Sequence, residues 1–261
     1  MQMGTAAISD RLPTLVNLGY KTDVRIGPGW ILFAIASYIL WIFTAVFAFN
    51  GITLPILNLQ QTLGLLGTLA FATSTGVSFL VSSLISRQNK HAEREQEIAW
   101  EILNGVQSRT RPERMHVLLP LSSAEQDFSI LLQRTRQHSA ILWSLLVLIP
   151  YAGWVFVIAA LFLLTRDSNI HETMERSLFE DLDRTVTAGG WQRAALDGQI
   201  PPSRNGTLYA IASVLTVGIV AISWLYVMII GEEAHFRFHS VLEPRLLEAF
   251  SNQGSRTGSV G

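Results

Sequence analysis

One arrangement of residues that could do chemistry occurs three times in this chain. In each copy a histidine is followed by a glutamate four positions later, and mostly apolar residues stand seven, eight and eleven positions after the histidine. On a helix these positions fall within roughly a 100° sector, so the polar pair would share a face with the apolar stripe. The three pairs are His91 and Glu95, His171 and Glu175, and His239 and Glu243.

Two kinds of chemistry fit such pairs. An imidazole and a carboxylate four residues apart can hydrogen-bond to each other and so orient a helix whose apolar face packs. Alternatively, both groups can bind one metal ion, and three helices could assemble a His/carboxylate centre. We expect the structural pairing, with no metal and no other cofactor. The candidate ligands for the metal alternative are His91, Glu95, His171, Glu175, His239 and Glu243.

Each of the three copies directly follows an uncharged apolar run. A fourth such run lies nearer the N-terminus and is not followed by a copy. A hydrocarbon core about 30 Å thick needs about 20 residues of helix to cross it. Four runs without Asp, Glu, Lys, Arg or His meet this length, with 20, 23, 25 and 23 residues: Trp30–Phe49, Leu63–Ile85, Ala140–Leu164 and Leu208–Ile230. The sequence therefore predicts an all-α membrane protein with four transmembrane helices, internal repeats and amphipathic helices after the membrane runs.

The runs divide the chain into seven parts. They are a cytoplasmic N-terminal segment (1–29), a transmembrane helical hairpin (30–85), a charged helical loop (86–139), the third transmembrane helix (140–164), a second charged helical loop (165–207), the fourth transmembrane helix (208–230), and an amphipathic helix with a flexible tail (231–261).

The third run contains helix breakers at its middle, Pro150 and Gly153. Proline inside a helix removes one backbone hydrogen bond and bends the helix. The run is therefore either a kinked span or a shallow re-entrant hairpin, and on length we expect the kinked span. In that case His171 would lie on the opposite side of the membrane from His91 and His239, so the three pairs could not meet. Only the re-entrant alternative would bring them together.

The distribution of basic residues predicts the orientation. If all four runs span, segments 1–29, 86–139 and 231–261 share one side with 3 + 8 + 3 = 14 Lys and Arg residues, against 5 in segment 165–207. Cytoplasmic segments carry the excess of basic residues. We therefore expect a multi-pass protein of the cell membrane with both termini in the cytoplasm.

The later part of the chain resembles a family of uncharacterised prokaryotic multi-pass membrane proteins with repeated RN…TxGI…WxY…HFxxHxxxE modules. The resemblance covers roughly residues 140–250 and implies a repeated helical membrane architecture, with no known activity. The third run has Pro150 and Gly153 where the family's T-x-G would stand. The matching residues are Leu164–Asp167, His171 and Glu175, and then Arg204-Asn205, Leu208-Tyr209, Thr216–Ile219, Trp224–Tyr226, His235–Arg237, His239 and Glu243.

Composition limits the function classes. The chain has 49% hydrophobic and 15% charged residues, a net charge of −1 and no cysteine. This balance excludes a basic nucleic-acid-binding surface, and the lack of cysteine excludes thiol chemistry. With no catalytic motif visible, we expect a non-enzymatic membrane scaffold or accessory subunit. Its partners would be the lipid bilayer and either another membrane protein or a second copy of the chain. The alternatives are a small transporter or channel that uses the broken third and fourth runs, and a metal-binding membrane protein that uses the His/Glu repeats.

Overall fold

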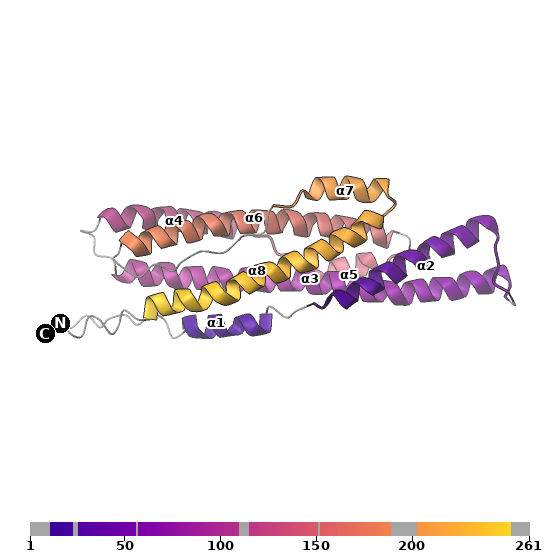
Figure 1. Cartoon of the computed structure of the whole chain (residues 1–261), viewed down its shortest axis with the longest axis horizontal. Helices are drawn as coiled ribbons and strands as arrows, with labels where there is room; N and C mark the ends of the chain where they lie inside the picture. Colours follow the sequence, from indigo (N-terminus) through magenta and orange to yellow (C-terminus); the bar gives the residue numbers. More distant parts are fainter. Residues whose placement is uncertain are drawn as a thin grey trace.

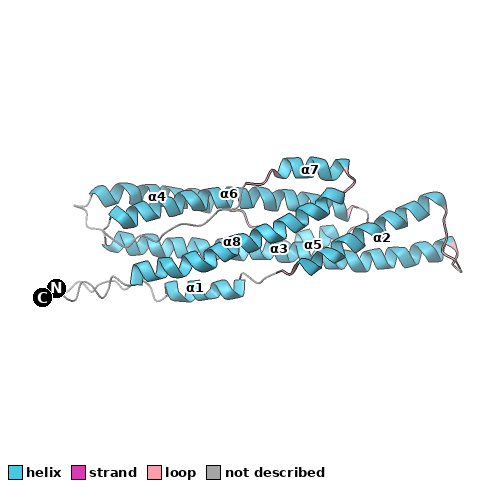
Figure 2. Cartoon of the chain, in the orientation of Figure 1, coloured by secondary structure: helices cyan, strands magenta, loops and turns pink. Residues whose placement is uncertain are grey.

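The computed structural model describes residues 11–22, 26–55, 57–109, 115–150, 152–188 and 203–251, and every element among these residues is helical (Figure 2). The flexible tail predicted after the last helix lies largely outside the described residues. The elements are α1 (Arg11–Thr22), the short 3-10 helix η1 (Pro28–Trp30), α2 (Ile31–Asn50), α3 (Leu59–Arg109), α4 (Met115–Arg134), α5 (Ala140–Val147), α6 (Gly153–Ala188), α7 (Gly206–Leu215) and α8 (Ile219–Ser251).

Four of these helices are long and apolar enough to cross a membrane. They are α2, α3, α6 and α8, and in the last three the apolar stretch is only part of a much longer helix. The all-α membrane class predicted from the sequence is thereby confirmed. The amphipathic helices expected after the membrane runs are not separate elements in the described residues. They continue α3, α6 and α8 without a break (Figure 1).

The first two apolar runs form the expected helical hairpin. Helix α2 ends at Gly51, which adopts a left-handed backbone conformation with φ 61° and so turns the chain out of the helix. Helix α3 begins after Asn58, whose side chain accepts a hydrogen bond from the backbone of Gln61 at 2.9 Å, while the Gln61 side chain accepts one from the Asn58 backbone at 3.1 Å. This reciprocal pair satisfies backbone donors that a helix start leaves open.

The third run is a helical hairpin rather than a kinked helix. Helix α5 ends at Val147, and α6 begins at Gly153 and returns alongside α5. The two ends of the run meet, because His138 Nε2 lies 2.5 Å from Asp167 Oδ2. The run 140–164 is therefore not the single kinked helix that was expected, and it has the hairpin shape that the re-entrant alternative requires. The helix is interrupted near Pro150, and the chain then reverses direction instead of continuing along the axis of α5.

The fourth run (208–230), for which the sequence left open whether it spans or re-enters, is also a hairpin. Helix α7 ends at Leu215, and α8 starts at Ile219 after Val217 and Gly218, both with positive φ. The start of the run again meets its end: the guanidinium of Arg204 lies against Gly231, where a Cβ atom would overlap it. Two consecutive positive φ angles, at Val217 and Gly218, reverse the chain direction between α7 and α8.

The long helices α3, α6 and α8 lie side by side along the length of the molecule (Figure 1). They contribute to two apolar cores. One core includes Leu84, Leu161 and Trp224 and lies at the level of the apolar runs. The other includes Ile102, Leu178 and Leu242, and helices α1 and α4 help to form it. Between these two cores the same three helices bury a group of ionisable side chains.

Candidate metal centre

The three His/Glu pairs converge on one another in the interior of the bundle. Helix α3 brings the first pair, α6 the second and α8 the third, and the exposed fraction of each of the six side chains is at most 9%: His91, Glu95, His171, Glu175, His239 and Glu243. They can meet because both hairpins return their helices to the end of the molecule where α3 continues. The sequence-based objection that His171 would lie opposite the other pairs is thus removed.

The apolar residues of the repeat explain why the pairs face inwards. In α3 they are Ile98, Ala99 and Ile102, and all three are buried in the second core. In α6 they are Leu178, Phe179 and Leu182, which are buried in the same core. Since residues four and seven positions apart share a helix face, burying this stripe also buries the histidine and glutamate. The predicted common face is confirmed for these two copies.

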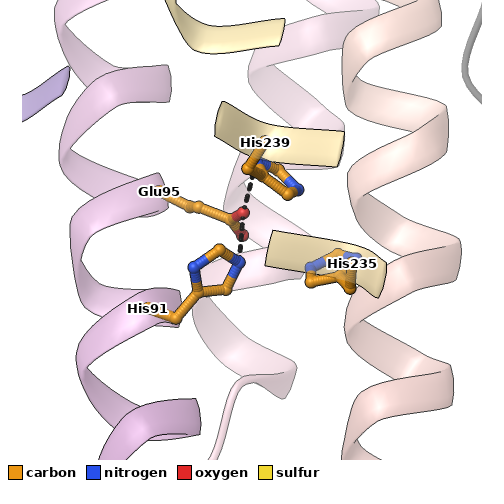
Figure 3. Close-up of side chains that lie close together, drawn as sticks. All are labelled: His91, Glu95, His235 and His239. Atoms are coloured by element: carbon orange, nitrogen blue, oxygen red, sulfur yellow. Dashed lines mark ion pairs between the residues drawn. The ribbon is translucent and has the colours of Figure 1, made fainter. Parts of the chain in front are cut away.

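Glu95 is the centre of the cluster, and its two carboxylate oxygens face different helices. Oε1 lies 2.6 Å from His91 Nε2 and 2.9 Å from His239 Nδ1. Oε2 lies 2.5 Å from His171 Nε2. The carboxylate therefore connects all three helices, whereas the sequence-based hypothesis paired each histidine with the glutamate of its own helix. Figure 3 shows Glu95 between His91 and His239.

Glu175 is the second carboxylate of the cluster and also makes its closest contact with another helix. Its Oε1 lies 2.7 Å from His239 Nε2. Its Oε2 lies 3.6 Å from His235 Nε2 and 4.0 Å from His171 Nε2, so the partner on its own helix is the most distant. His239 thus lies between Glu95 and Glu175, with one ring nitrogen toward each.

His235 belongs to this cluster, although the sequence-based set of candidates did not include it. It is 7% exposed, and its ring lies beside those of His91 and His239 (Figure 3). The signal was present in the sequence, because His235 precedes His239 by the same four residues that separate each histidine from its glutamate. It was obscured by the neighbouring Glu232 and Glu233, which suggested a solvent-facing helix exit.

Among the six predicted ligands, Glu243 lies at the edge of the cluster. Arg94 donates a hydrogen bond to its Oε1 at 2.7 Å, and both side chains are buried. The same oxygen lies 3.6 Å from His239 Nδ1. A guanidinium that neutralises Glu243 leaves it less available as a metal ligand and holds it as a neighbour of His239.

Several buried atoms of the cluster lie close together without the geometry of a hydrogen bond. They include Glu95 Oε1, Glu175 Oε1 and both ring nitrogens of His239. Buried polar groups are ordinarily satisfied, and leaving one unsatisfied costs about 1–3 kcal/mol. A cation that binds between these nitrogen and oxygen atoms could satisfy several of their lone pairs at once.

Two overlapping sets of these side chains have the spacing of a metal site. In each set one ligand atom per residue lies within 4.8 Å of all the others. Two ligands about 2.1 Å from one ion are at most about 4.2 Å apart, so binding would draw the widest pairs inwards by a few tenths of an ångström. The sets are His91, Glu95, His235 and His239, and Glu95, His171, Glu175 and His235.

Comparison with known proteins does not assign this cluster. No family model matches the chain, and no curated protein or solved structure is similar to it. The resemblance to uncharacterised prokaryotic membrane proteins stays a prediction.

The side chains of the cluster, which lie beyond the apolar runs, alter one another's ionisation. Burial by itself would raise the pKa of Glu95, but the surrounding imidazoles, first that of His239, hold it well below its usual value. Burial would lower the pKa of His239, yet Glu175 and Glu95 raise it well above the usual value. Burial together with neighbouring imidazoles lowers the pKa of His235 well below its usual value. The pKa shifts thus favour the charged form of His239, which lies between two carboxylates, and the neutral form of His235.

Proposed function

We propose that this protein is a membrane protein that binds divalent transition-metal ions in the buried His/Glu cluster. One observation carries the proposal: four buried imidazoles and two buried carboxylates from three helices form two overlapping sets of four, and within each set the ligand atoms lie no more than 4.8 Å apart. Burying so many ionisable groups is unfavourable unless their charges are compensated. A divalent ion compensates both carboxylates and uses the imidazole lone pairs at the same time.

The types of ligand favour zinc, iron or manganese. Imidazole nitrogen suits zinc and iron, carboxylate oxygen suits harder ions such as manganese, and mixed sets occur with all three. Calcium and magnesium prefer oxygen ligands alone, so four histidines argue against them. Copper(I) favours the thiolates and thioethers of soft sites, and the chain has no cysteine.

The hairpins also support an orientation in the membrane. If the third and fourth runs are re-entrant, segments 1–29, 86–139, 165–207 and 231–261 share one side and hold all 19 Lys and Arg residues, while the link 50–62 holds none. The excess of basic residues marks the cytoplasmic side. We infer that the metal cluster and both termini face the cytoplasm of the cell membrane. The scaffold or accessory role expected from the sequence stays a prediction, and metal binding is compatible with it.

Metal analysis of the purified protein tests the proposal. The full chain is purified in mild detergent with a tag that contains no histidine, and bound metals are measured by mass spectrometry. We expect a stoichiometric transition metal in the wild type, and its loss in Glu95→Gln. The matched control Glu180→Gln, at an exposed position, should keep it.

Thermal melts give an independent readout. A ligand that binds the folded state at 100 times its Kd stabilises it by about 2.7 kcal/mol. Removing metal with a chelator should therefore lower the Tm of the wild type, and adding zinc should restore it, with neither effect in Glu95→Gln. A wild type that contains no transition metal and whose Tm responds to neither treatment would overturn the proposal.

A further inference from the structure

We propose that the cluster holds two metal ions rather than one, with the carboxylate of Glu95 bridging them. This inference rests on the proposed function and specifies the number of ions and the ligands of each. It starts from the fact that the two sets of potential ligands share Glu95 and His235 but otherwise draw on different residues.

The two oxygens of Glu95 define the two positions. Oε1 faces His91 and His239, and Oε2 faces His171, with distances of 2.6, 2.9 and 2.5 Å to the ring nitrogens. Two ligands about 2.1 Å from one ion at the tetrahedral angle are about 3.4 Å apart. The observed separations are shorter than this by about 0.5–0.9 Å, so an ion that enters would push the ligands apart by that amount. Each oxygen, together with the imidazoles that it faces, outlines one ion position.

The first position takes Glu95 Oε1, His91 Nε2 and His239 Nδ1. The other nitrogen of His239 is 2.7 Å from Glu175 Oε1, without the alignment of a hydrogen bond. A carboxylate beside the free nitrogen of a metal-binding histidine is a common neighbour of such ligands, and Glu175 takes that place here. Three protein ligands leave one place open for a water molecule or an external ligand, as in zinc sites that do chemistry.

The second position takes Glu95 Oε2, His171 Nε2, His235 Nε2 and Glu175 Oε2. The last two atoms are 3.6 Å apart, and His171 Nε2 is 4.0 Å from the same oxygen of Glu175. The first separation is close to the about 3.4 Å expected between two ligands of one tetrahedral ion, and the second is longer by about 0.6 Å, so binding would draw His171 and Glu175 together. The second position is therefore complete with protein ligands alone, unlike the first.

A single ion cannot use all of these groups. Glu95 presents its oxygens to histidines on different sides, so an ion at one oxygen leaves the imidazoles at the other without a ligand role. Two ions bridged by a carboxylate typically lie about 3.5–4 Å apart and act on one substrate together. The arrangement thus favours a dinuclear centre whose first ion is open to an external ligand.

Manganese serves as the probe, because its electron paramagnetic resonance separates isolated ions from coupled pairs. Metal-free full-length protein in detergent is titrated with Mn²⁺, and bound equivalents are counted by mass spectrometry. We expect two equivalents per chain and the broadened spectrum of a coupled pair. His91→Ala and His171→Ala should each retain one equivalent with the six-line spectrum of an isolated ion, while the control Glu180→Gln, at an exposed position, keeps two coupled ions.

The outcomes separate the two proposals. One equivalent in the wild type with an isolated-ion spectrum overturns the dinuclear centre but leaves metal binding intact, and zero equivalents of every transition metal tested overturns both. Two uncoupled ions would place the second outside this cluster and overturn the bridging role of Glu95. Size-exclusion profiles establish that each variant is folded, and the wild-type stoichiometry decides the question even if a variant fails to fold.

Discussion

The second and third apolar runs have nearly the same length, 23 and 25 residues, and fold in opposite ways. The second lies within one continuous helix, α3, whereas the third is divided between α5 and α6, which fold back on each other. Length and hydropathy therefore do not distinguish a straight helix from a hairpin. The difference arises from the breakers in the middle and from the polar groups at the ends of each run.

The ends of the broken runs are held together by polar contacts that a straight helix could not make. His138 and Asp167, at the two ends of the third run, are in contact at 2.5 Å. Between the two hairpins, the side chain of Asn169 donates to the Arg204 carbonyl at 2.6 Å and accepts from the Arg204 backbone at 3.0 Å. No comparable contact joins the ends of the second run, which are separated by the full length of that part of α3.

Cysteine labelling tests this contrast most directly, because its outcome is all or none. The chain has no cysteine, so single cysteines can be introduced at the exposed positions Thr53, Ser108, Thr187 and Ser240. We expect Thr187→Cys, Ser108→Cys and Ser240→Cys to react with a membrane-impermeant reagent from the same side, and Thr53→Cys from the other. Labelling of Thr187→Cys from the side of Thr53→Cys would mean that the third run spans the membrane as a straight helix.

Stability of the third run's turn should depend strongly on Gly153. A Cβ atom at this position would collide with the backbone oxygen of Val147, so Gly153→Ala should destabilise the protein by about 1–3 kcal/mol. Gly64→Ala in α3 is the matched control, since nothing lies within 4 Å of its Cβ position. It should be neutral or stabilising by up to about 1 kcal/mol through helix propensity. Thermal melts in detergent compare them, and equal losses in both variants would contradict the tight turn.

A smaller effect, of opposite sign, is expected at the break in the fourth run. Val217 has φ 52°, an unfavourable conformation for a β-branched residue, and its side chain is 71% exposed. Val217→Gly should therefore stabilise the protein by about 0.5–1 kcal/mol. The control Val241→Gly, at a 51% exposed position within α8, should destabilise it by about 0.5 kcal/mol or more. A loss of stability at both positions would show that the positive φ carries no strain.

The sequence predicted the helical membrane class, the first hairpin and the common face of the first two His/Glu pairs. These features follow from local periodicity and from run length, which a single segment displays. It did not predict the pairing of His171 with Glu95, because that contact joins α6 to α3 and depends on whether the third run turns back. Pro150 and Gly153 indicated a break, but a kinked helix and a hairpin share that signal. The two are distinguished by contacts such as that between His138 and Asp167, which no local pattern contains.

The two later hairpins have a consequence for the link between α2 and α3 during membrane insertion. This link comprises the eight residues 51–58 and carries no charge. If the third and fourth runs enter and leave the bilayer on one face, this link is the only connection between helices that must be translocated during biosynthesis. Each later hairpin can then insert from the face on which it is made. Assembly of the protein would thus require no charged connection between helices to pass through the hydrocarbon layer, which is the most expensive step in inserting a multi-pass chain.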